Sequence, residues 1–139
     1  MAGTPTPIFP QLIKNYVQTI LPADTTTIKA LVVAGTNGTK IESINITSTD
    51  TAVRDLAIYA TISAVNYLIG TITIPITAGN TNAIPSIDVL RHLQLPSLAY
   101  DSNGNKYLYL ASGTTLSISV LSTVTTAKQI TVFAQGGDY

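Results

Sequence analysis

Threonine and isoleucine are the two side chains that most constrain this protein: 22 of its 139 residues are Thr and 17 are Ile. Both branch at Cβ, which restricts their rotamers in a helix and suits them to the pleated surface of a sheet. Ionisable groups are sparse, with seven basic and seven acidic residues, one His and no Cys. The composition therefore predicts an all-β fold and leaves little for catalysis, so we expect no enzyme.

The low proportion of charged residues bears on which partners this protein can bind. Charged residues make up 10% of the chain, against about 25% in an average soluble protein. We therefore expect part of the surface to be covered by another protein. The net charge is zero and no run of Lys or Arg occurs, which argues against binding to nucleic acid or to an anionic membrane. No stretch approaches the ~20 apolar residues of a membrane span.

Proline is concentrated in the first 24 residues. Because proline lacks an N–H donor, this part is a poor internal strand, and we expect an extended N-terminal arm over residues 1–24. Residues 25–139 would form the sandwich domain. Residues 12–21 stay ambiguous, since Leu12, Tyr16 and Ile20 have helical spacing but also fit an irregular strand. The opening residues lack the basic and apolar regions of a secretory signal, which predicts synthesis in a cytoplasm without export by that route.

From Thr25 onward, β-branched runs alternate with turn residues. Gly35-Thr-Asn-Gly38 predicts a hairpin between its flanking strands, and Asp101-Ser-Asn-Gly-Asn105 predicts a second tight turn. The tail after the last strand is expected to contain two flexible glycines. About eight short strands indicate an antiparallel β-sandwich, with a jelly roll as first choice. The expected strands are 25–34, 41–47, 53–62, 67–76, a short edge strand within 84–95, 106–111, 116–121 and 129–134.

Motifs that could carry chemistry fail on spacing. In residues 35–40 the two glycines are too close together for a phosphate loop, and the segment joins strands rather than opening a helix. The Asp101 turn has its glycine fourth rather than sixth, and no bidentate Glu follows, so a calcium loop is also disfavoured. His92 has no nucleophile motif with it. We expect no metal and no cofactor.

Tyrosines are the remaining candidates for ligand contact. A Tyr ring offers a flat face and a hydroxyl on which a sugar can stack. Since the chain has no Trp, ordinary packing on a sheet is the simpler interpretation. The tyrosines considered for this role are Tyr59, Tyr67, Tyr100, Tyr107 and Tyr109.

Several segments together resemble capsid decoration, or cement, proteins of tailed bacteriophages, similar to the cement protein of a Bordetella phage. The resemblance runs nearly end to end. The segments are Thr6-Pro-Ile-Phe9, Val33-Ala-Gly-Thr-Asn-Gly-Thr-Lys-Ile-Glu-Ser-Ile44, Leu68-Ile-Gly-Thr-Ile-Thr-Ile-Pro75 and Gly136-Gly-Asp-Tyr139.

The resemblance implies a virion protein on the capsid exterior. Its partners would be the major capsid protein and itself, as a dimer or trimer. We expect the docking elements to be the segments outside the sandwich. The alternative is a carbohydrate- or receptor-binding module that uses the tyrosines and the Asp101 turn. The expected docking residues are Thr4, Pro5, Thr6, Pro7, Ile8, Phe9, Asp138 and Tyr139.

Overall fold

The computed structural model describes residues 9–92 and 98–139, and within them every regular element except one short 3-10 helix is a strand. This confirms the all-β prediction. The helix is η1 (Pro22–Asp24). The strands are β1 (Leu12–Ile20), β2 (Lys29–Val33), β3 (Thr39–Ser48), β4 (Arg54–Ile62), β5 (Val65–Ile74), β6 (Ile87–Asp88), β7 (Ala99–Tyr100), β8 (Lys106–Leu110), β9 (Thr114–Val120) and β10 (Ile130–Asp138).

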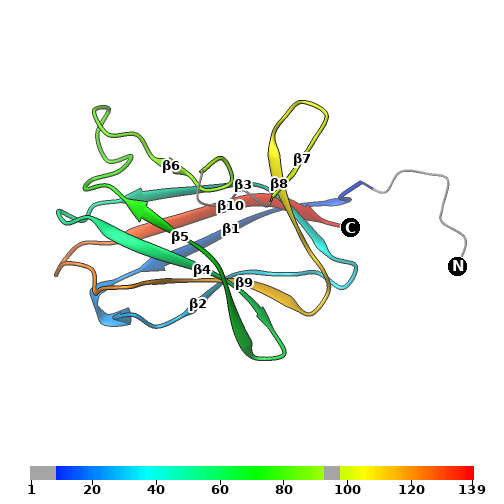
Figure 1. Ribbon diagram of the computed structural model, residues 1–139, viewed down its shortest axis with the longest axis horizontal. Helices are drawn as coiled ribbons and strands as arrows, with labels where there is room; N and C mark the ends of the chain where they lie inside the picture. The colour runs from blue at the N-terminus through cyan, green and yellow to red at the C-terminus, as the bar shows by residue number, and fades with distance from the viewer. Residues whose placement is uncertain (1–8, 93–97) are drawn as a thin grey trace, which may run out of the picture.

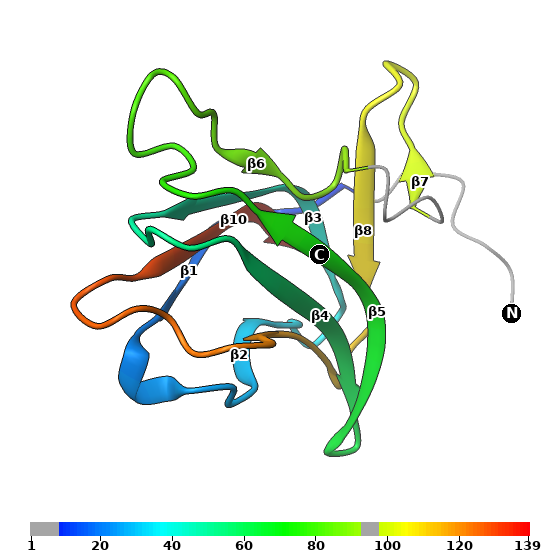
Figure 2. The same cartoon turned by 60° about the vertical axis from the view of Figure 1, so that its left-hand side comes forward.

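Two antiparallel sheets pack face to face (Figures 1 and 2). Sheet A has the order β1-β10-β3-β8-β7, with β6 paired to β3, and sheet B has the order β2-β9-β4-β5. Strands that are neighbours in the chain therefore often lie in different sheets. The predicted antiparallel β-sandwich is confirmed.

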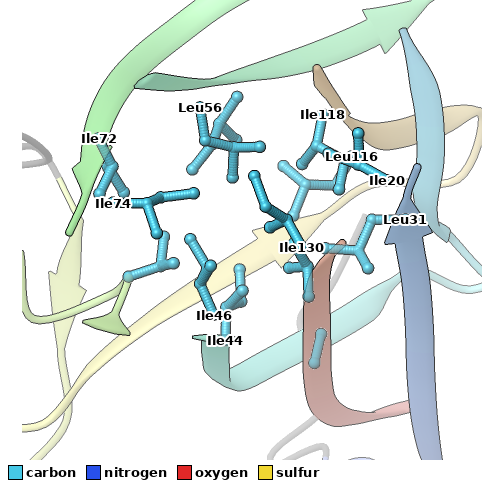
Figure 3. Close-up of a cluster of buried hydrophobic side chains, with 14 of the residues drawn as sticks. Ile20, Leu31, Ile44, Ile46, Leu56, Ile72, Ile74, Leu116, Ile118 and Ile130 are labelled. Atoms are coloured by element: carbon cyan, nitrogen blue, oxygen red, sulfur yellow. The ribbon is translucent and has the colours of Figure 1, made fainter. Parts of the chain in front are cut away.

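The core lies between the sheets and consists mainly of Ile, Leu and Val (Figure 3). Leu116, Ile118 and Val120 alternate with polar residues along β9, and all three are buried, as expected for residues that point to the same face of a strand. Ile72 and Ile74 are buried in the same way on β5. Each such side chain contributes about 1.5–3 kcal/mol by leaving water.

The N-terminal part joins the sandwich earlier than its prolines suggest. Residues 12–20 form β1, which pairs residue for residue with β10 from Leu12↔Asp138 to Ile20↔Ile130. The prolines flank this strand, at Pro10 and Pro22, so they remove no donor from its ladder. The sandwich therefore begins at Leu12, inside the segment expected to be an arm.

The turn at residues 35–38 does not close a hairpin, so that prediction is wrong. β2 pairs with β9 in sheet B, whereas β3 pairs with β10 in sheet A. The chain does reverse there, because Gly38 has φ +95° and its N–H donates to the Gly35 carbonyl at 3.0 Å. A tight reversal fixes only the local path, so it can carry the chain from one sheet to the other.

Candidate functional site

The described part of the expected arm, from Phe9 onward, and the C-terminal pair of docking residues meet at one end of sheet A. The Gln11 N–H donates to the Asp138 carbonyl at 2.8 Å, and the Tyr139 N–H donates to the Gly38 carbonyl at 3.2 Å. We call this region the arm end and define it as residues 9–12, 35–39 and 136–139. Figure 1 shows the start of β1 and the C-terminus side by side there. Of the expected arm contacts, Phe9 is 70% exposed; Thr4, Pro5, Thr6, Pro7 and Ile8 lie outside the described residues.

Asp138 is an internal anchor of the arm end. It lies in β10, is only 8% exposed, and pairs with the Lys14 ammonium at 2.5 Å. The hydroxyls of Thr39 and Tyr16 also donate to its carboxylate. The hydrogen bond from Lys14, followed by that from Thr39, lowers the pKa of Asp138 below its usual value. Its side chain is therefore committed to holding β1, β3 and β10 together, which leaves Tyr139 as the accessible member of the expected pair.

The two glycines before Asp138 pack tightly within β10, although we expected them to be a flexible tail. A Cβ on Gly136 would collide with the Lys40 carbonyl oxygen of β3. A Cβ on Gly137 would lie 2.8 Å from the Leu12 carbonyl oxygen of β1. Because backbone atoms on both neighbouring strands approach so closely, only glycine fits at these positions.

The outer face of β1 and β10 is uncharged and partly apolar. Successive side chains of a strand point to opposite faces, so the inward position of Ile20 turns Ile13 and Val17 outward, where they are 87% and 61% exposed. A 350 Å³ groove runs beside Ile13 at the arm end. Its lining residues are Pro10, Ile13, Asn15, Glu42, Gln135, Gly136 and Gly137.

Tyrosines gather next to the arm end on the same sheet. The rings of Tyr107 and Tyr109 meet edge to face with centroids 4.8 Å apart, and Tyr109 lies 6.2 Å from Tyr139. The Lys40 ammonium lies 4.8 Å from the centre of the Tyr107 ring, which is cation–π geometry. Asn37 and Gln11 add amides to the edge of this cluster. The structure thus brings together Tyr107 and Tyr109, whereas Tyr59 and Tyr67 lie on sheet B.

A 270 Å³ groove beside the tyrosines holds six of the chain's fourteen charged residues. Four of these charges form two ion pairs: Lys40 lies 3.4 Å from Glu42, and Arg91 lies 3.4 Å from Asp88. Arg91 also donates to the Asn105 side chain at 2.9 Å. The charged residues are Lys40, Glu42, Asp88, Arg91, Asp101 and Lys106.

The Asp101 turn closes the β7–β8 hairpin, as predicted. The Asp101 carboxylate accepts hydrogen bonds from the N–H groups of Asn103 and Asn105 at 2.9 Å each. These hydrogen bonds, that from Asn105 first, lower the pKa of Asp101. The carboxylate therefore stabilises the turn that contains it.

Across residues 9–92 and 98–139, no three His, Asp or Glu side chains gather closely enough to hold a metal ion. The same part of the chain contains no helix long and apolar enough to cross a membrane. His92 follows β6, where its N–H donates to the Val89 carbonyl at 3.1 Å.

No protein-family model matches this chain, and a search of curated proteins finds no similar sequence.

Proposed function

We propose that this chain is a structural protein of a phage particle: a jelly-roll sandwich that binds the outside of the capsid and joins neighbouring major capsid subunits. The order of the long strands supports the jelly roll. With the two-residue strands β6 and β7 set aside, the first, eighth, third and sixth long strands form one sheet, and the second, seventh, fourth and fifth form the other. Nested Greek keys produce this kind of interleaving. No catalytic step belongs to the proposed role.

The uncharged outer face of β1 and β10, next to the root of the arm, is the observation that carries this proposal. Ile13 and Val17 would gain about 1.5–3 kcal/mol each on full burial against a partner. The side chains that β1 and β10 place on this face carry no charge, so their burial carries little electrostatic cost, and Glu42 of β3 borders the groove beside Ile13. The arm leaves the sandwich beside the same face, at Phe9 and Pro10, so the arm and this face could contact one capsid joint.

Co-sedimentation with shells tests the proposal. The full chain should pellet with purified shells of the phage that encodes it. Ile13→Glu should weaken binding at least tenfold, because it places a charge in the covered face. Deletion of the first ten residues should weaken it as well. Val33→Glu is the matched control, since Val33 is also apolar and exposed, at 64% against 87% for Ile13, but lies on sheet B. A full-length chain that stays in the supernatant would refute the proposal.

Carbohydrate binding is the second candidate, favoured by the tyrosine cluster. Tyr109 and Tyr139 border an open hollow together with Gln11 and Asn37, so flat rings and amides face the same space. Such a combination suits a sugar, which stacks through its C–H face and hydrogen-bonds through its hydroxyls. Glycan-array binding that Tyr109→Ala abolishes would support this function. Copy number on the particle separates the two candidates, since a shell protein requires hundreds of copies and a receptor-binding module only a few.

A further inference from the structure

β5 is an edge strand that lacks two features that usually block pairing with another strand, charge and shortness, although its register against β4 shifts once, at Ile69, between the pairs Ile58↔Gly70 and Tyr59↔Leu68. It ends sheet B, and its ten residues contain no charged side chain. The other edges within the described residues differ: β1 carries Lys14, β2 carries Lys29, β6 carries Asp88, and the two-residue β7 runs directly into Asp101. Natural edge strands are commonly protected by charge or by shortness. β5 has neither.

The lack of charge extends well beyond β5 itself. No Asp, Glu, Lys, Arg or His occurs from residue 56 to residue 87. This run includes nearly all of β4, all of β5 and the loop that follows. Two copies could therefore meet along this edge without like-charge repulsion and without burying an ion.

The hairpin tip, which we define as residues 62–69, projects beyond the part of sheet B that the core covers. Ile62 and Val65 pair across the hairpin, and Tyr67 pairs with Ala60. These positions share the face of β4 that carries the buried Leu56 and Ile58. Even so, Ile62, Val65 and Tyr67 are 45–55% exposed. Figure 2 shows the tip extending away from sheet A. It is a continuation of the core face that has no second layer.

Main-chain groups are also available at the tip. Ile62↔Val65 closes a two-residue turn in which Ser63 and Ala64 both have positive φ. In such a hairpin the closing pair is hydrogen-bonded and the next pair is not. Asn66 and Leu68 lie opposite Thr61 and Tyr59 in the non-bonded positions, so their N–H and C=O groups point away from β4. These are the groups that an added strand would use.

We propose that two copies of this chain associate through antiparallel pairing of β5 with β5 about a twofold axis near Leu68. Sheet B then continues across both copies as one sheet of eight strands. An antiparallel pair of identical strands is self-complementary and closes after two copies. This pairing also places the tip of each strand beside the base of the other. At that base lie the partner's loop after β5, which exposes Ile76, and the part of the partner's sheet B that is covered by its core. These parts of the partner can supply the second layer that Ile62, Val65 and Tyr67 lack.

Sedimentation equilibrium of the full chain over a range of concentrations tests the proposal. The wild-type chain should approach twice its 14.6 kDa mass as its concentration rises. Leu68→Lys places two ammonium groups at the axis and should weaken association at least 30-fold. Ile13→Lys is the matched control, because it makes the same change on the exposed edge strand β1, and it should dimerise like the wild type. Thermal unfolding of each variant verifies that it is folded.

A second measurement locates the interface without disturbing its charge. The chain has no Cys, so Leu68→Cys and Ile13→Cys each provide a single attachment point for a nitroxide spin label. Because paired strands lie ~4.8 Å apart, labels at position 68 should lie within about 15 Å of each other in the dimer. Labels at position 13 should be much farther apart.

Three results would overturn the proposal: a wild-type chain that stays monomeric at all concentrations, dimers unaffected by Leu68→Lys, or dimers disrupted by Ile13→Lys. None of these results bears on shell binding, which uses a different face of the molecule. Conversely, a dimer that ignores capsids would refute the proposed function and leave this inference intact.

Discussion

The arm end and the hairpin tip both consist of strand ends, but internal contacts anchor the arm end, whereas the side chains of the hairpin tip are left exposed. At the arm end, three strands converge on one carboxylate, and two glycines allow the backbones to approach closely. At the hairpin tip, apolar side chains continue the core face but have nothing packed above them. Of the two regions, only the arm end has an internal polar anchor, although it also exposes Phe9. The arm end stabilises the fold, and the tip has surface left for a partner.

Adding one methyl group at the arm end is the most disruptive change we expect. Gly136→Ala should lower the free energy of unfolding by about 3 kcal/mol or more, because the new Cβ collides with a backbone carbonyl of β3 that no rotamer change can move. Denaturant titration measures the loss. Gly104→Ala is the control, since no atom lies within 4 Å of its Cβ and only its φ of +79° is unfavourable. Equal losses in the two variants would mean that the close approach at Gly136 is not what matters.

Removing the carboxylate should have the next largest effect. Asp138→Ala leaves Lys14 and the Thr39 hydroxyl without their partner, which should cost about 2 kcal/mol. Thermal unfolding at pH 7 measures this cost. Asp55→Ala removes an exposed acid of sheet B and should change little. If Asp138→Ala proved as stable as the wild type, the arm end would owe its stability to the glycines alone.

Acid should weaken the anchored regions selectively. The pKa of Asp138 is lowered by Lys14, and that of the fully buried Asp50 is lowered because hydrogen bonds from Thr125 and Arg54 outweigh the opposing effect of burial. A carboxylate with a lowered folded-state pKa adds stability above its unfolded pKa, near 3.8, and this stability is lost as pH falls through the folded-state value. The melting temperature should therefore drop below about pH 4. Asp138→Asn should flatten that drop, and an unchanged profile would contradict this account.

The turn of the hairpin tip should gain stability from a glycine. Ala64 has φ +63°, which costs an L-residue roughly 1 kcal/mol or more. Ala64→Gly relieves this strain, although glycine gains entropy in the unfolded chain. The expected net gain is about 0.5 kcal/mol, measured by denaturant titration. Ala111→Gly, at an exposed site without positive φ, should lower stability instead.

The smallest effect should come from the exposed face of the tip. Val65→Thr changes a half-exposed side chain and should alter monomer stability by less than about 0.5 kcal/mol. Unfolding must be measured at a concentration low enough to exclude association. A loss of unfolding free energy above about 1 kcal/mol would show that the tip is packed within one copy. The tip and the arm end would then not differ in the way described.

Local pattern was enough to predict the sandwich and several of its strands. Runs of β-branched and apolar residues between turn residues predicted strands over 53–62 and 116–121, and β4 and β9 lie there. Turn residues predicted the reversal at Asp101. These features depend on neighbours within a few residues along the chain.

Features that depend on distant residues could not be predicted in the same way. β1 was ambiguous because its partner β10 lies more than a hundred residues further along the chain. The role of Gly136 is set by the Lys40 carbonyl on a strand that sequence alone does not place beside it. Asp138 looked like a tail residue for the same reason. A close pair of glycines inside a β-branched chain is the one local signal that could have suggested close strand approach.

The central place of β10 in sheet A has a consequence for biosynthesis. β1 emerges from the ribosome among the first residues of this sequence, but both it and β3 wait for β10 before they can pair with it. Loop closure over such distances is slow, and unpaired strands invite wrong associations. A truncated chain that ends before Ile130 would therefore leave β1 and β3 without the strand that pairs with both of them. We expect cells to degrade or aggregate that product, so that only finished chains accumulate as folded protein.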